Sequence, residues 1–572
     1  MFKRAGSGLI LLSLLLGPYR IPRSDTLFLE VNTTLGIGLG VLFIVFGLIS
    51  KFDSRQVNLK PFGWIIPFVL LILSDIPFRS RNFFQPNFFF LGIIGSGVIA
   101  YLCWKLLKWR FPIFVLITSV SISIFAFLSE LNGHLLFSDD HPSFLYRLIQ
   151  LRDNFPYIPF YNPLWNAGVD AREFFPSGML NVFFLGIPFV YFGDIVNNYN
   201  YLITCILFIV CPLSIYFSAR LMGLSSSVAA FSAVIGLSSS LSWYKWALSY
   251  GTVGFIVSMI SFILVLGGVS KLVSGSKGIL LYLCLFVSVS LAIFWSLSVL
   301  LFLPLLVFVW WYRNDVQAKP KVFVLILVLI LTHLPWMSLF VKASNVFDFV
   351  FKDSKKVSGE VVVSKSSIAP QKEDVDFSIS SFSRQARIVA NDTNPLIVLF
   401  ALPGLLTFSR KNKFLMLGMA GWILSIATSG LFFKPQLELD RFFMMLGLLA
   451  AIPAGAYCGE VMHLAKSKVQ IALAIIVFAV VVYLPIWQMR LLSKETVIKF
   501  YKARPVVTEL AEALKERAPY GRILFAGFTL HEFSDGHVAP LPAMTGASLI
   551  ASRYQHDRWQ YEDVIPLQYR RK

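Results

Sequence analysis

The chain has 572 residues, of which 56% are hydrophobic and only 14% are charged, and its mean hydropathy is +0.71. Soluble domains carry about 25% charged residues, so this composition excludes an ordinary soluble enzyme, a disordered chain and a disulfide-rich secreted domain. The net charge of +19 fits basic cytoplasmic loops and anionic lipid head groups. We therefore expect membrane lipids, and no nucleic acid, among the partners.

Apolar runs of membrane-spanning length dominate the chain. A spanning helix needs about 20 mostly apolar residues, which predicts an all-α polytopic membrane protein with about 14 to 15 transmembrane helices. A shorter run at 5–17 is either a first span or a cleaved, signal-like segment. The remaining runs lie at 33–50, 62–78, 88–104, 111–131, 201–219, 225–241, 250–269, 278–293, 295–312, 321–341, 394–409, 414–432, 442–462 and 468–488.

Lysine and arginine gather in alternate loops, which we assign to the cytoplasm. They include Lys271, Lys277, Arg313, Lys319, Lys321, Arg410, Lys411 and Lys413. The alternation holds if 179–195, which contains Pro188, lies on the outer surface as an interfacial helix. Three segments are then external: 132–200, 342–393 and 490–572.

The segment after the span at 111–131 carries the densest mixture of acids, bases and aromatic residues. It begins Ser138-Asp139-Asp140-His141-Pro142. Adjacent acids repel each other, so one keeps a raised pKa, which suits a general base or a pair of ligands for a divalent cation. The same residues also suit a helix N-cap, and the two interpretations are compatible.

The other two external segments differ in character. Segment 342–393 is rich in lysine and serine and is either a solvated loop or a lid. In segment 490–572, residues 506–517 have helical amphipathic spacing and 522–526 resemble a strand. We expect a small α/β external domain packed on the membrane domain. A histidine- and acid-containing stretch at 530–537 is either a polar turn or a metal site.

The chain lacks the sequence motifs of several functional classes. The chain has no phosphate-binding P-loop, no GxGxxG opening a helix, no HExxH and no GxSxG. The apolar runs carry almost no acidic or basic residues at mid-depth, which disfavours ion-coupled transport. A lipid or polysaccharide flippase, or a non-catalytic membrane assembly protein, stays open as the alternative to an enzyme.

The order of these features resembles the type C (GT-C) glycosyltransferase superfamily, including protein mannosyltransferase-like enzymes. The resemblance rests on Ser138-Asp139-Asp140-His141, on the Trp-, Gly- and Pro-rich stretch 162–176, on the step 218–224 and on Leu439-Asp440-Arg441-Phe442. It covers 111–572 and leaves 1–110 outside, so we divide the chain into 1–110, a membrane domain at 111–489 and an external domain at 490–572. Thr545-Gly546 also resembles a tail element of uncharacterised pyruvoyl-tetrahydropterin-synthase-related membrane proteins.

The resemblance implies inverting transfer of a sugar from a polyprenyl-phosphate donor to a glycan, lipid or protein acceptor, outside a prokaryotic plasma membrane. It implies Asp139 or Asp140 as general base. His141, Asp170 and Glu173 would orient the acceptor or a metal, and Arg441 would bind the donor phosphate; simple interfacial snorkelling is the alternative for Arg441. A divalent cation (Mg or Mn) at Asp140 and Glu173 is the one cofactor considered. The His-Pro-Pro of protein mannosyltransferases is replaced by Phe175-Pro176-Ser177.

Overall fold

The computed structural model describes residues 133–138, 140–158, 161–162, 164, 169–170, 177–237, 245–316, 319–344, 395–433, 439–464, 503–518, 521–523 and 540–549, with scattered positions between 113 and 131. The expected spans before 111 and at 468–488, most of loop 342–393, the stretch 530–537, Asp139 and Glu173 lie outside these residues.

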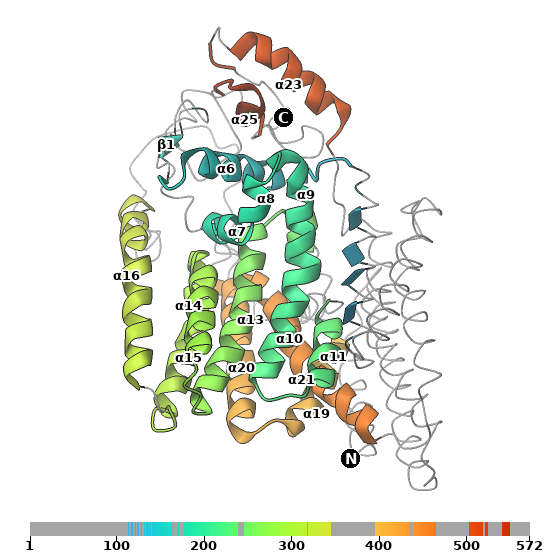
Figure 1. The fold of residues 1–572 in the computed structure, drawn as a ribbon, viewed down its shortest axis with the longest axis vertical. Coiled ribbons are helices and arrows are strands. Elements are labelled where there is room, and N and C mark those ends of the chain that lie inside the picture. The colour runs from blue at the N-terminus through green and yellow to red at the C-terminus, as the bar shows by residue number, and fades with distance from the viewer. Residues whose placement is uncertain are drawn as a thin grey trace.

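Long apolar helices make up most of the described fold, as predicted (Figure 1). Four are long and apolar enough to cross a membrane: Ile195–Leu221, Val253–Val273, Lys319–Ser338 and Leu439–Glu460. The protein is therefore an integral membrane protein. The helices of the bundle are α9 (Ile195–Cys205), the π-helix η3 (Ile206–Val210), α10 (Cys211–Leu221), α11 (Ser226–Leu237), α13 (Val253–Val273), α14 (Ile279–Ile293), η5 (Ser296–Ser298), α15 (Val299–Trp311), α16 (Lys319–Ser344), α19 (Pro395–Gly404), η6 (Leu405–Thr407), α20 (Arg410–Phe433) and α21 (Phe443–Leu464).

The helices differ sharply in burial. In the most apolar 18-residue stretch of α13, 94% is buried, whereas in the corresponding stretch of α16 only 6% is buried. Figure 1 shows α13 in the middle of the bundle and α16 at its edge. Helix α13 lies close to α10 at Gly267, where an added Cβ would lie only 2.6 Å from Ser218 Cα. Helix α13 and the most apolar part of Leu439–Glu460, which is 100% buried, thus lie inside the bundle, whereas α16 presents most of its apolar stretch outward.

Basic turns meet at one end of the bundle. Lys321 Nζ donates to the Lys277 carbonyl (3.3 Å), and Lys411 forms an ion pair with Asp315 (3.2 Å). Lys411 also donates to the Val273 carbonyl (3.3 Å). The turns after α13, α15 and α19, which the sequence analysis grouped on one side, therefore lie together, opposite α6, α23 and α25 in Figure 1.

The other end of the bundle holds the first large loop. It contains α6 (His141–Asn154), two short antiparallel strands β1 (Tyr161–Asn162) and β2 (Val169–Asp170), α7 (Met179–Leu185) and α8 (Ile187–Tyr191). The expected surface helix 179–195 is two short helices that meet at Gly186. Residues 179–183 of α7 are buried, and Asn181 donates to the carbonyls of Gly254 (2.9 Å) and Leu291 (3.0 Å). Phe184, Ile187 and Tyr191, which follow, are exposed.

The C-terminal segment packs on this loop. The amphipathic spacing at 506–517 is confirmed as α23 (Pro505–Arg517), and α25 (Leu541–Thr545) follows. Ala503 N donates to the Leu135 carbonyl (2.8 Å), and Leu549 N donates to the Leu164 carbonyl (2.7 Å). Of the expected strand at 522–526, the described part is a single bridge from Ile523 to Leu549. The small α/β domain stays a prediction.

Candidate functional site

Asp140 stands at the start of α6, where the backbone is held from outside the helix. It occupies the N-cap position, but its side chain makes no capping hydrogen bond. Its amide donates to the Tyr250 carbonyl (3.2 Å). Next to it, Gly251 has φ +68, and a Cβ there would lie 2.6 Å from His141 N. Asp140 therefore occupies the N-cap position of α6, but its carboxylate does not cap the helix and is left for another role.

Two arginines, Arg147 on the same helix and Arg441 from a distant part of the sequence, act on this carboxylate. Burial raises the pKa of Asp140 above its ordinary value of 3.8, while the positive charges of Arg147 and Arg441 lower it. Asp140 nevertheless keeps partial exposure to solvent. A partly exposed carboxylate with a raised pKa is a stronger base than an ordinary aspartate, and the guanidinium charges favour its ionised form.

Arg147 is buried, with 4% of its surface exposed. Its Nη1 donates to Ser177 Oγ (2.8 Å), and its Nε donates to the Ser143 carbonyl (3.3 Å). Its guanidinium also lies 4.4 Å from the ring centroid of Phe144. Sequence reasoning assigned Arg147 no role. The signal was its position two helical turns after Asp140, which places both residues on one face of α6.

Arg441 belongs to a 3₁₀ turn, η8 (Leu439–Phe442), that opens α21. Its guanidinium carbon lies 4.8 Å from the ring centroid of Trp246 and 5.6 Å from that of Phe255. Arg441 is partly exposed as a residue, and its guanidinium is held over two rings. Such cation–π contacts fix the plane of an arginine. Simple snorkelling does not account for this placement.

Aromatic rings surround Arg441 in a connected group. Trp246 lies on η4 (Lys245–Ser249), a π-helix, with its ring centroid 4.9 Å from that of Tyr250. Trp295 packs between Phe255 (4.9 Å) and Phe442 (5.5 Å). Short π-helices are frequent at functional sites, and rings beside a guanidinium suit a sugar phosphate. The sequence analysis did not single out Trp246.

His141 lies behind Asp140, away from solvent. It has no exposed surface, and its Nδ1 is 2.8 Å from the Tyr199 hydroxyl. Burial lowers the pKa of His141 to about 3, so the ring is neutral at physiological pH. This position does not fit the expected contact with an acceptor or a metal, because the ring is enclosed by protein.

The side chains of the remaining candidates lie outside what the structure describes. Asp170 lies on β2, where its backbone pairs with that of Tyr161, and only its backbone is described. Asp139 and Glu173 lie outside the described residues. Within the described ranges, no three His, Cys, Asp or Glu side chains gather where they could hold a metal ion. Asp140 is instead accompanied by two arginines, so the divalent cation stays an expectation.

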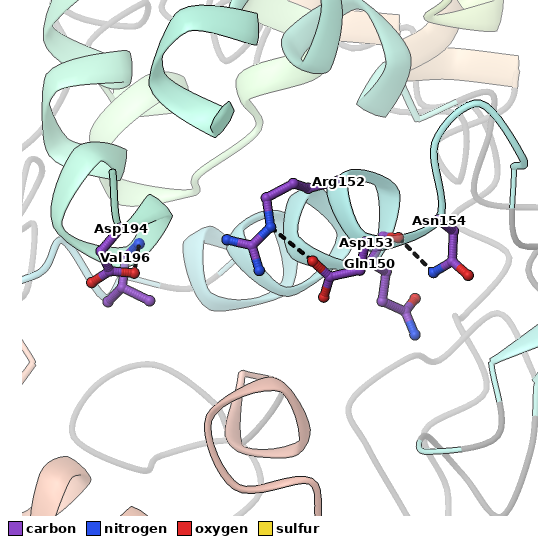
Figure 2. A network of polar contacts seen from close by, with 6 residues as sticks. All are labelled: Gln150, Arg152, Asp153, Asn154, Asp194 and Val196. Carbon is purple, nitrogen blue, oxygen red and sulfur yellow. Dashed lines mark hydrogen bonds and ion pairs between the residues drawn. The ribbon is translucent and has the colours of Figure 1, made fainter. Parts of the chain in front are cut away.

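The opposite end of α6 carries a second arginine and aspartate pair. Arg152 Nε donates to Asp153 Oδ1 (2.8 Å), and the two side chains are 30% and 53% exposed. Figure 2 shows this pair beside Asn154, whose Nδ2 donates to the Gln150 carbonyl (2.8 Å). These contacts join residues within four positions of each other, so they form a local surface feature.

Comparisons with known proteins find similarity only to solved structures. No protein-family profile matches the chain, and no curated protein matches it. The Archaeoglobus fulgidus oligosaccharyltransferase in its apo form is similar at 13% identity and TM-score 0.47, over 79% of this chain and 66% of that one. The same organism's AglB, in complex with an inhibitory peptide and a dolichol-phosphate, is similar at 12% identity and TM-score 0.47, over 79% and 65% of the two chains.

ArnT from Cupriavidus metallidurans, bound to undecaprenyl phosphate, is similar at 14% identity and TM-score 0.45, over 80% of this chain and 87% of that one. The chain spans about two thirds of the length of the archaeal enzyme. At such scores and identities these likenesses assign no superfamily, no residue role and no substrate to this chain.

Proposed function

We propose that this protein is a membrane glycosyltransferase that moves a sugar from a polyprenyl-phosphate donor to a glycan, lipid or protein acceptor. The observation that carries the proposal is the convergence of Asp140 and Arg441, 301 positions apart in the sequence, at one end of the bundle. The charge of Arg441 acts on the Asp140 carboxylate, and the guanidinium lies over Trp246. A base and an anion-binding group are the two elements that this transfer requires.

In the proposed reaction, the Asp140 carboxylate removes the proton of the acceptor nucleophile. The nucleophile attacks the anomeric carbon of the sugar, and the bond from that carbon to the phosphate oxygen breaks. The electron pair leaves with the polyprenyl phosphate, and the anomeric configuration inverts. General-base catalysis of this kind contributes about 10²- to 10⁴-fold in rate.

Arg441 serves the leaving group in this proposal. Negative charge grows on the phosphate as the sugar departs, and a preorganised guanidinium stabilises that charge without reorganising. The rings of Trp246 and Phe255 fix the plane of the guanidinium in advance. No step of the proposed reaction passes through a metal ion.

The site is proposed to work on the external face of a prokaryotic plasma membrane. The turns that carry Lys277, Lys321 and Lys411 meet at the end of the bundle opposite α6. Basic loops are retained on the cytoplasmic side. Asp140, Arg441 and the C-terminal segment that packs on the first loop would then face outward.

Complementation of a deletion strain tests the proposal. Mass profiles of the surface glycans are compared for the deletion strain and for strains that express wild-type protein, Asp140→Asn or Asp139→Asn, each with its membrane level measured. We expect the deletion to shorten a glycan by one sugar, wild type to restore it and Asp140→Asn not to do so. Full restoration by both Asn variants would reject base catalysis here and favour a flippase or assembly role.

A further inference from the structure

Three elements meet around the imidazole of His141. From α9, the Tyr199 hydroxyl lies 2.8 Å from Nδ1, and the two rings meet edge to face at 5.8 Å. From η4, the backbone of Ala247 and Leu248 faces the ring. From the turn after η4, Gly251 approaches so closely that a Cβ would lie 3.1 Å from His141 Cδ2. One buried side chain thus ties the start of α6 to both α9 and η4.

The η4 segment also carries the ring under Arg441. Trp246 lies one residue before Ala247, and its carbonyl accepts hydrogen bonds from Thr252 N (3.0 Å) and Thr252 Oγ1 (2.9 Å). Asp140 N donates to the Tyr250 carbonyl of the same segment. A movement of Asp140 relative to Trp246 would therefore strain the His141 contacts, because His141 is covalently adjacent to Asp140.

Tyr199 completes the link. It is 1% exposed, and its hydroxyl lies 2.8 Å from the buried Nδ1 of His141. If Tyr199 contributed packing alone, phenylalanine would fill the position equally well, because it has the same ring and no polar atom to bury.

We propose that His141 and Tyr199 form a positioning pair, which holds Asp140 at a fixed distance from Trp246 and Arg441 and so sets the rate of sugar transfer. This inference rests on the proposed glycosyltransferase function and adds two residues to it. The pair contacts neither donor nor acceptor, since both rings are enclosed by protein. It acts through the place that it gives to the carboxylate.

The test compares transfer rate with donor-lipid affinity in the full-length protein. The rate is that of glycan restoration after induced expression in the deletion strain. The affinity is the Kd for undecaprenyl phosphate, measured by native mass spectrometry of protein in lipid nanodiscs. The variants are Tyr199→Phe, His141→Ala and His141→Asn, whose amide can reach the position of Nδ1. Tyr201→Phe and His134→Ala are matched controls, because both side chains are exposed.

We expect Tyr199→Phe and His141→Ala to lower the rate by about 10- to 100-fold, as small misplacements of catalytic groups do. Their Kd should stay within about twofold of wild type, because Arg441 and its rings are unchanged. His141→Asn should recover most of the rate, and both controls should match wild type. A Kd that weakens in parallel with the rate, or no rescue by asparagine, would overturn the positioning role. Wild-type rates in Tyr199→Phe and His141→Ala beside an inactive Asp140→Asn would overturn it while leaving the proposed function intact.

Discussion

The two ends of α6 carry the same pair of residue types in opposite settings. At its C-terminal end, Arg152 and Asp153 are neighbours in sequence, and Asp153 is 53% exposed. At its N-terminal end, Asp140 is largely enclosed and responds to Arg147 on the same helix and to Arg441 in another part of the chain. Exposed ion pairs contribute about 0 to 1 kcal/mol. Charges brought together by the fold in a poorly hydrated place interact strongly and mark functional sites.

Beyond the loss of the base itself, the largest effect is expected at Arg441, which has no counterpart at the C-terminal end of α6. Arg441→Ala should slow transfer by about 10²- to 10³-fold, the range for loss of one charge-stabilising donor. Arg441→Lys keeps the charge but cannot stack flat on Trp246, so it should recover only part of the rate. Glycan restoration rates measure both. Arg152→Ala is the matched control, and an equal loss in that variant would remove the distinction between the two ends.

The pH dependence of transfer should report the environment of Asp140. The ionised carboxylate is the active form, and burial raises its pKa above 3.8. The rate should therefore fall about tenfold per pH unit as pH drops through a value above 3.8. Because Arg441 lowers this pKa, Arg441→Gln should move the acid limb to still higher pH. Rates in isolated membranes across pH measure the limb; an unmoved limb in that variant would show that Arg441 does not act on the base.

A smaller effect is expected at Gly251, which lies against the start of α6. Gly251→Ala adds a Cβ 2.6 Å from His141 N at φ +68, so both the clash and the backbone conformation oppose it. We expect a loss of about 1 to 3 kcal/mol, seen as a lower Tm in detergent. Gly133→Ala is the control, since Gly133 has φ +77 but open space around its Cβ position. Equal Tm losses in the two variants would mean that the contact of Gly251 with α6 does not contribute to stability.

The smallest effect is expected at the exposed pair in Figure 2. Asp153→Asn should change the free energy of unfolding by less than about 1 kcal/mol, because solvent and salt screen the interaction. Thermal unfolding of the variant in detergent measures it. A loss well above that size would show that this end of α6 is coupled to the rest of the fold.

The sequence predicts the local features of this fold better than the contacts between distant segments. The length of the apolar runs was enough to predict the spans that begin near 195, 253, 319 and 439. The amphipathic spacing was enough to predict α23. Both signals depend on nearby residues alone.

The segment 179–195 was expected to be one helix on the surface, and in its second part Ile187, Tyr191 and Phe192 are exposed. Its first part, 179–183, is buried, and Asn181 donates to the carbonyls of Gly254 and Leu291. The sequence of the segment contains no sign of those two partners.

The candidate site divides in the same way. Asp140 and Arg441 were identified from motifs, since each stands at a helix start that the sequence displays. Trp246 and Tyr199 lie just outside the apolar runs at 225–241, 250–269 and 201–219, where an aromatic residue in a site looks like any other aromatic residue at a membrane surface. Arg147 was visible as a basic residue two turns from Asp140. Its burial against Ser177, however, depends on a contact across 30 residues.

The most direct test of the central claim is the mass spectrum of polyprenyl lipids from deletion cells that express Asp140→Asn or Asp153→Asn. If Asp140 is the base of a lipid-linked sugar transfer, Asp140→Asn cells accumulate the unused polyprenyl-phosphate sugar, and its mass identifies the sugar. Asp153→Asn cells should then match wild type. Equal donor levels in the two strains, with normal surface glycans in both, would contradict the assignment of the active site to the N-terminal end of α6.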